Sequence, residues 1–263
     1  MTAPTISKIA LGAVLLSALA ATSGCSTTQV HSTVDDTEAP MISTTIIVRP
    51  ESWRPVSERR GWSGIEVGYE HQSGDAMQNI KTSEYIAYDL EKQFNGPQNV
   101  HQDASVDHTH VAYNRLFSFG PNFQLEPSLG IAHDSIFITT RGVVTDVRAA
   151  QSLGEQSIRY HQSVTGITGG IIPRWNFNRL FAVEVPMRIG VGFASREDSL
   201  SSLSSRNNGI TELINPTLVF RPVKNISLGV GYVVRSQHVE TRLDESNLDL
   251  NFQGFSAAVR MTF

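Results

Sequence analysis

The chain has 263 residues, of which 40% are hydrophobic and 17% are charged, and its formal net charge is −4. The negative net charge and the lack of a strongly basic segment argue against a nucleic-acid-binding protein. No run of about 18 apolar residues follows the N-terminal segment, so no membrane-spanning helix is expected there. Membrane strands remain possible, because alternating apolar and polar residues give a mean hydropathy near neutral.

Residues 1–24 have the pattern of a signal peptide. Lys8 precedes the apolar run IALGAVLLSALAA, whose length fits the hydrophobic region of an exported protein. The run leads into ATSGCS, which contains Cys25, the single cysteine of the chain. Cys25 resembles the acylated cysteine of bacterial lipoproteins, and the alternative is an ordinary small-residue cleavage site at residues 18–20. Both interpretations predict export, and we favour a lipid on Cys25.

Residues 25–60 are rich in Ser, Thr and Asp and contain three prolines, which is typical of an extended tether. The segment MISTTIIV at residues 41–48 is the exception, because it has the pattern of a short strand that could join the folded domain. We therefore expect a lipid-anchored periplasmic tether over residues 25–60 and the folded domain over residues 61–263.

Three short turns organise the folded domain: FGPN at 119–122, WNFNR at 175–179 and RPVKN at 221–225. Each contains Pro, Gly or Asn between two alternating segments, which is the signal of a β-hairpin. Residues 180–193 show the alternation most clearly, since every odd-numbered position from Phe181 to Phe193 is apolar. Such a stripe on a surface strand of a soluble protein would leave a large apolar area exposed to water.

The connections at the other end of these hairpins are long and polar, at about 73–105, 134–158, 194–209 and 236–248. Short turns at one end and long loops at the other are typical of bacterial outer-membrane barrels, in which the turns are periplasmic. Counting back from the C-terminus predicts eight strands, at 62–72, 107–119, 123–133, 161–175, 180–193, 210–221, 226–235 and 249–263. The expected fold is all-β: a transmembrane antiparallel up-and-down β-barrel with both chain ends in the periplasm. SEYIAYDLEKQF at 83–94 could add a strand or form a short helix, and we interpret it as a structured loop.

The last predicted strand ends in GFSAAVRMTF and carries one apolar face. That face consists of Phe255, Ala257, Val259, Met261 and Phe263. Residues 61–263 resemble the small eight-stranded outer-membrane proteins of the OmpA-barrel, OmpX and OmpW type, whose assembly machinery recognises such a C-terminal signature. The resemblance implies an integral protein of a Gram-negative outer membrane, in contact with lipids, lipopolysaccharide and the barrel-assembly machinery. Loops carry the functions of this family, so it implies a surface ligand without identifying one.

Charged residues alternate with glycines on the face that we expect to point inward. The charged residues are Glu66, Glu126, Glu184, Arg174, Arg188, Arg221 and Arg260. Eight strands enclose a lumen only wide enough for side chains, and an unpaired buried charge costs several kcal/mol. We therefore expect a structural network that closes the lumen, and the alternative is a path for protons, ions or small solutes.

His108 and His110 share one strand face, a spacing that can bind a transition metal ion. His71, His133 and His161 fall on the opposite face and do not join that pair. We interpret the histidines as residues of the membrane interface and expect neither a metal nor another cofactor.

HQSVTG at residues 161–166 resembles the His-x-Ser-x-x-Gly stretch of outer-membrane lipid A deacylases. The resemblance implies His161 as general base and Ser163 as nucleophile, both facing lipid. No acidic residue at a fitting place completes a triad. We therefore expect a non-enzymatic lipoprotein barrel that uses its surface loops in envelope maintenance or surface interaction, and the alternatives are a lipid-modifying enzyme and a small-solute channel.

Overall fold

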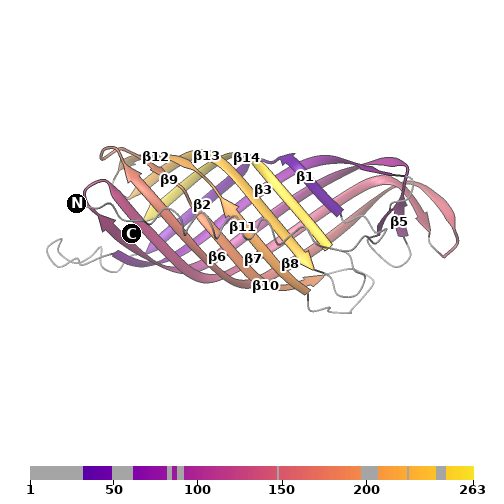
Figure 1. Ribbon diagram of the computed structural model, residues 1–263, viewed down its shortest axis with the longest axis horizontal. Helices are drawn as coiled ribbons and strands as arrows, with labels where there is room; N and C mark the ends of the chain where they lie inside the picture. Colours follow the sequence, from indigo (N-terminus) through magenta and orange to yellow (C-terminus); the bar gives the residue numbers. More distant parts are fainter. Residues whose placement is uncertain are drawn as a thin grey trace, which may run out of the picture.

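The computed structural model describes residues 32–48, 62–81, 85–87, 92–146, 148–196, 207–223, 225–240 and 247–263. Within these ranges the chain is almost entirely strand, and Figure 1 shows the strands tilted around a common axis. No helix in the described ranges is long and apolar enough to cross a membrane. Cys25 and the expected signal peptide lie outside the described residues.

The described residues form one 14-stranded sheet. Its strands are β1 (Ser32–Glu38), β2 (Met41–Val48), β3 (Trp62–Ile80), β4 (Tyr85–Ala87), β5 (Lys92–Asn95), β6 (Gln98–Phe119), β7 (Phe123–Asp146), β8 (Gln151–Asn176), β9 (Phe181–Glu184), β10 (Met187–Arg196), β11 (Asn207–Ile214), β12 (Thr217–Val223), β13 (Ile226–Glu240) and β14 (Asn247–Thr262).

Hydrogen bonding closes most of these strands into a ring. In order around the ring, the strands are β2, β3, β6, β7 and β8, the successive strands β9 and β10, the successive strands β11 and β12, and then β13 and β14. β14 pairs with β2, and this pair closes the ring. β9 and β10 follow one another along β8, because Pro186 lacks the amide hydrogen that would continue the ladder. Pro216 interrupts β11 and β12 in the same way. Each of the eight strands expected from the sequence has its place in this ring.

The ring contains, in the described residues, one strand more than the eight expected, because residues 41–48 enter it. β2 pairs in parallel with β14, from Met41 opposite Ser256 to Ile47 opposite Thr262, and antiparallel with β3. Up-and-down strands alternate in direction, so a ring with an odd number of them must contain one parallel pair. β2 thereby covers the hydrogen-bonding edges that β3 and β14 would otherwise expose.

The two ends of the ring differ. The turns from β6 to β7, from β8 to β9 and from β12 to β13 lie at one end, which we call the turn end, and the opposite end is the loop end. Gly120 adopts a φ of 78° in the first of these turns, a conformation that favours glycine. In the second turn the Asn178 side-chain oxygen accepts hydrogen bonds from the amides of Leu180 and Phe181, at 2.8 and 2.9 Å.

Residues 32–38 belong to the sheet, although the sequence indicated a tether there, and residues 41–48 form the strand that their pattern allowed. β1 pairs in parallel with the part of β14 near the loop end, with Ser32 opposite Leu248. β2 then follows β14 to the turn end, where the amide of Phe263 donates to the carbonyl of Ile47 at 2.9 Å. The described chain therefore begins at the loop end and not at the turn end where both chain ends were expected.

Two of the expected long loops are largely strand. The β3–β6 pair continues to Ile80 opposite Gln98, and the β7–β8 pair continues to Asp146 opposite Gln151. These hairpins project beyond the rest of the ring, toward the side of Figure 1 where β5 is labelled. Their composition is polar, but most of their inward positions are apolar and buried, such as Val100, Ala104 and Val106, while Gln102 and Thr140 are buried polar residues on the same face.

The projecting hairpins enclose a hydrophobic cluster. It contains Ile80, Ile86, Phe94, Val100, Ala104, Val106, Ile136, Ile138, Val144, Tyr160, Val164, Ala194, Val239, Leu250, Phe252 and Ala39. β4 pairs with β5 and β5 pairs with β7, so residues 85–87 and 92–95 are short strands beside this cluster and not parts of the helix considered from the sequence. Apolar side chains therefore fill the interior at the loop end.

The outer face of the ring is strongly apolar near the turn end. On β7 the outward side chains from Phe123 to Ile131 are apolar, and the same holds for β8 from Ile167 to Trp175 apart from Gly169, and for β13 from Ile226 to Val234. Many of these side chains are more than 40% exposed, among them Leu129 and Val230. Large aromatic residues such as Trp175 and Phe177 gather where the turns lie.

Candidate functional site in the ring interior

The seven charged residues singled out from the sequence all take part in ion pairs inside the ring. Five interior residues near the turn end form what we call the turn-side cluster: Glu126, Glu184, Arg174, Arg221 and Arg260. Glu184, which is 3% exposed, is its centre. Its carboxylate accepts from Arg260 Nη1 at 2.7 Å and from Arg174 Nε at 2.5 Å, and Arg221 Nη2 lies 3.6 Å away.

A second group, which we call the histidine cluster, lies further toward the loop end. It contains Glu66, Glu70, His108, His110, Asp134, Arg188 and Arg235. Glu70 accepts from Arg188 Nη1 at 2.6 Å and from Arg235 Nη2 at 3.0 Å. β10 and β13 supply these two guanidiniums, while β3 supplies the carboxylate, so the pairs connect strands across the interior.

His108 and His110 point inward and are 2% and 3% exposed, so they are not residues of a membrane interface. His108 Nδ1 lies 2.6 Å from Asp134 Oδ1, and His110 Nε2 lies 2.9 Å from Glu66 Oε1. Gly68 on β3 makes room for the second ring, because a Cβ there would lie 2.1 Å from His110 Cε1. The local sequence therefore favours this buried position of the imidazole.

The ten charged side chains of the two clusters balance overall but not locally. The histidine cluster has three carboxylates and two guanidiniums, whereas the turn-side cluster has two carboxylates and three guanidiniums. One negative charge is thus in excess at the histidine cluster when both imidazoles are neutral. A buried excess charge attracts a compensating ion because the surroundings screen it poorly.

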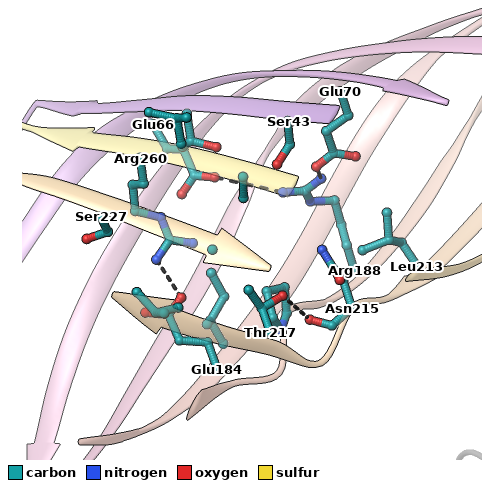
Figure 2. A pocket seen from close by; sticks show the side chains of 17 residues that line it. Ser43, Glu66, Glu70, Glu184, Arg188, Leu213, Asn215, Thr217, Ser227 and Arg260 are labelled. Atoms are coloured by element: carbon teal, nitrogen blue, oxygen red, sulfur yellow. Dashed lines mark hydrogen bonds and ion pairs between the residues drawn. The ribbon is translucent and has the colours of Figure 1, made fainter. Parts of the chain in front are cut away.

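A cavity of about 50 Å³ lies between the two clusters, which is space for a few water molecules. Figure 2 shows Arg188 reaching toward Glu70 and Glu66 on one side of it and Arg260 reaching toward Glu184 on the other. Asn215, between β11 and β12, and Thr217 of β12 add polar groups to its wall. The interior here is filled mainly by paired side chains.

Three members of the histidine cluster were missed in the sequence. Asp134 follows the last residue of the strand predicted at 123–133, so it was counted as loop, although β7 continues through it. Glu70 and Arg235 have the same phase as Glu66 and Ser227 in their strands, and extending the alternation would have placed them inside. The alternation of inward and outward side chains along these strands could therefore have identified Glu70 and Arg235.

His161 and Ser163 lie on the outer face of β8, and the structure gives them different partners. The His161 ring stacks on Phe137, with centroids 4.3 Å apart and planes at 5°. Ser163 Oγ shares a hydrogen bond with Ser195 Oγ at 2.7 Å. These contacts differ from the base and nucleophile pair that the deacylase resemblance implies.

The remaining residues singled out from the sequence lie on β14 or outside the described chain. Phe255 and Phe263 are exposed, and Phe255 meets Tyr232 of β13 edge-on with centroids 6.0 Å apart. Ala257, Val259 and Met261 follow in the same phase of the strand. Cys25 lies outside the described residues.

Comparison with known proteins leaves the geometry as the basis for function. No protein-family model, no curated protein and no solved structure matches this chain.

Proposed function

We propose that this chain is an outer-membrane β-barrel of a Gram-negative bacterium, anchored additionally by a lipid on Cys25. Its lumen is closed by the two charged clusters and the hydrophobic cluster, and it acts without catalysis. Its projecting hairpins serve surface interaction or envelope maintenance, with lipids, lipopolysaccharide and a surface ligand as partners and the barrel-assembly machinery as the insertion factor.

The apolar outer belt is the observation that carries this proposal. The outward apolar stretches on β7, β8 and β13 each span nine residues: Phe123 to Ile131, Ile167 to Trp175 and Ile226 to Val234. A tilted strand needs about 9–11 residues to cross the hydrocarbon core. A soluble protein does not usually leave so large an apolar surface in water.

Polar residues mark where the belt ends toward the loop end. On β7, Ile131 is followed on the same face by His133 and Ser135, and on β8, Ile167 adjoins Thr165 and Ser163. His133 Nδ1 lies 2.7 Å from Thr165 Oγ1, so these side chains pair along the outer face. Arg115 and Glu212 interrupt the belt, and the Arg115 guanidinium lies 5.2 Å from the centre of the Phe117 ring.

The inverted polarity of the ring also supports a membrane location. The outer face is apolar while the interior holds five carboxylates and five guanidiniums in the two clusters. A ring of paired strands leaves no backbone hydrogen-bonding group facing the lipid. The interior charges then lie away from the hydrocarbon, where their partners compensate them.

Gel mobility of the membrane-extracted full-length protein tests the proposal. Loaded in SDS without heating, the protein is expected to run as a compact form that shifts to its full apparent mass after boiling, because the ring has no open edge. Extraction should require a detergent that dissolves the outer membrane. Identical mobility with and without boiling, together with release from membranes by high salt, would contradict a barrel.

Cysteine labelling tests which end faces the outside. In a Cys25→Ser background, Asn99→Cys in the projecting β3–β6 hairpin is expected to react with a membrane-impermeant maleimide on intact cells. The matched variant Asn178→Cys in the turn between β8 and β9 should react only after permeabilisation. The reverse pattern would overturn the orientation, and labelling of both sites in intact cells would argue against a sealed transmembrane placement.

A further inference from the structure

Three buried side chains of the histidine cluster bring donor atoms together in a manner suited to a metal ion. Glu70, His108 and His110 each offer one ligand atom, and these atoms lie within 4.8 Å of one another. Glu70 is directly opposite His108 in the β3–β6 ladder, and Gly68 is opposite His110. We propose that these three residues bind a divalent transition metal ion of the Ni²⁺, Cu²⁺ or Zn²⁺ class, for which imidazole is a favoured ligand.

Asp134 fixes the first imidazole in the orientation that a metal ligand needs. A carboxylate only accepts hydrogen bonds, so the 2.6 Å contact requires that His108 Nδ1 carries the proton and donates to Asp134 Oδ1. The lone pair of neutral His108 is then on Nε2, which faces Glu70 and Arg188. Metal-binding histidines usually donate their other N–H to a carboxylate in this way. Thr211 Oγ1 in turn donates to Asp134 at 3.1 Å.

The Arg188 guanidinium now occupies the position between the three donors. Its Nη1 lies 2.6 Å from Glu70 Oε1 and 3.4 Å from His108 Nε2, and its Nη2 lies 3.4 Å from His110 Nε2. The three potential metal-ligand atoms, one each from Glu70, His108 and His110, thus all lie next to a cationic group. Glu66 Oε1, at 3.8 Å from Nη2, provides a second carboxylate to which the guanidinium can shift when a metal ion replaces it.

His110 is left unsatisfied by the present arrangement. Its Nε2 contacts both the Glu66 carboxylate, which only accepts, and the Arg188 guanidinium, which only donates. One nitrogen cannot satisfy both contacts, and Nδ1 is buried without a hydrogen-bond partner. An unsatisfied buried polar group costs about 1–3 kcal/mol. Coordination of a metal ion by His110 Nε2 would replace the two competing contacts of that nitrogen, and the imidazole proton would then lie on Nδ1.

Charge and the adjoining cavity also favour a cation here. The histidine cluster has one negative charge in excess, counting Glu66, Glu70 and Asp134 against Arg188 and Arg235. Glu70 and Arg188 also line the cavity between the two clusters, which has space for water molecules beside a bound ion. The site is distinct from the outward histidines, because His71 and His133 lie on the other face of the same sheet.

Metal titration of the folded, tag-free full-length protein in detergent tests this site. Isothermal titration with Ni²⁺ is expected to show one saturable ion per chain, and Cu²⁺ bound to the same protein should show hyperfine splitting from imidazole nitrogen in electron paramagnetic resonance. Asp134→Asn should weaken binding about ten- to a hundred-fold, as loss of an outer carboxylate partner does. His108→Ala should abolish the saturable phase. His133→Ala, which removes an outward imidazole, is the matched control and should leave it unchanged.

Arg188→Met provides an independent test. Because it removes the guanidinium that competes with the metal ion, it is expected to tighten Ni²⁺ binding at least tenfold. Folding of each variant is checked by its heat-dependent gel shift. The proposal is overturned if the wild-type protein binds no stoichiometric ion and shows no nitrogen splitting, or if His133→Ala and not His108→Ala removes the binding. Weaker binding by Arg188→Met would equally show that the guanidinium does not compete with a metal ion.

Discussion

Replacing Glu184 with Gln is expected to lower the free energy of unfolding by about 3–5 kcal/mol, since it removes one partner of a buried ion network. The Glu184 carboxylate contacts three guanidiniums, those of Arg174, Arg221 and Arg260. Without it the turn-side cluster retains Glu126 as its carboxylate, which lies 3.3 Å from Arg174 Nη2. Arg221 and Arg260 would then lose their ion pairs with Glu184 inside the ring.

Urea unfolding of the protein reconstituted in lipid bilayers measures this effect, with intrinsic Trp fluorescence as the signal. Glu155→Gln is the matched control, because Glu155 is exposed on the part of β8 near the loop end, and its substitution should change the free energy of unfolding by less than about 0.5 kcal/mol. A second variant, Glu184→Gln combined with Arg260→Met, should recover part of the loss because it removes one of the uncompensated cations. Equal unfolding midpoints for the two single variants would contradict the assigned role of Glu184.

The turn end of the fold could be predicted from the sequence because its signals are local. The turns around Gly120 and Asn178 depend on residues that favour those backbone conformations wherever they occur, and the strands flanking them begin within a residue or two of the expected positions. Alternation then determined the phase of each strand. The phase placed Glu184 and Arg188 on the inner face without knowledge of their partners.

The loop end could not be predicted in the same way. The segment around Val100 and Val106 is polar on average, and its apolar positions become meaningful only when Ile136 and Ile138 of the neighbouring hairpin lie against them. The entry of β2 depends on β14, more than 200 residues later in the chain. Alternation identifies a strand, but it does not say which edge that strand will cover.

The partners within the candidate site were equally inaccessible from the sequence. Glu70 and Arg188 are separated by 118 residues, and Glu70 and Arg235 by 165. The spacing of His108 and His110 indicated a shared face and therefore the possibility of joint binding. Whether that face meets lipid or the interior depends on the whole ring, and this decides between an interfacial pair and a buried cluster of acids and bases.

The substitution Leu129→Arg tests the membrane placement most directly. Leu129 is 64% exposed and lies within the apolar stretch on β7 that runs from Phe123 to Ile131. In a bilayer, Leu129→Arg is expected to destabilise the fold by about 2–4 kcal/mol, whereas Ser135→Arg, on the same face beyond the end of that stretch, should cost about 0–1 kcal/mol. The difference arises because the first guanidinium must lie within hydrocarbon while the second reaches the headgroups.

Both free energies come from urea titrations of the protein in the same lipid bilayers, so strand, face and added side chain are matched and depth is the variable. For a ring surrounded by water, both positions would be surface sites, where substitutions usually change stability by less than about 0.5 kcal/mol. Equal and small effects at the two positions would therefore argue against the membrane. A large effect at position 129 with a small one at position 135 requires an apolar medium around the belt, because burial within the protein would favour the reverse: Leu129 is more exposed than Ser135.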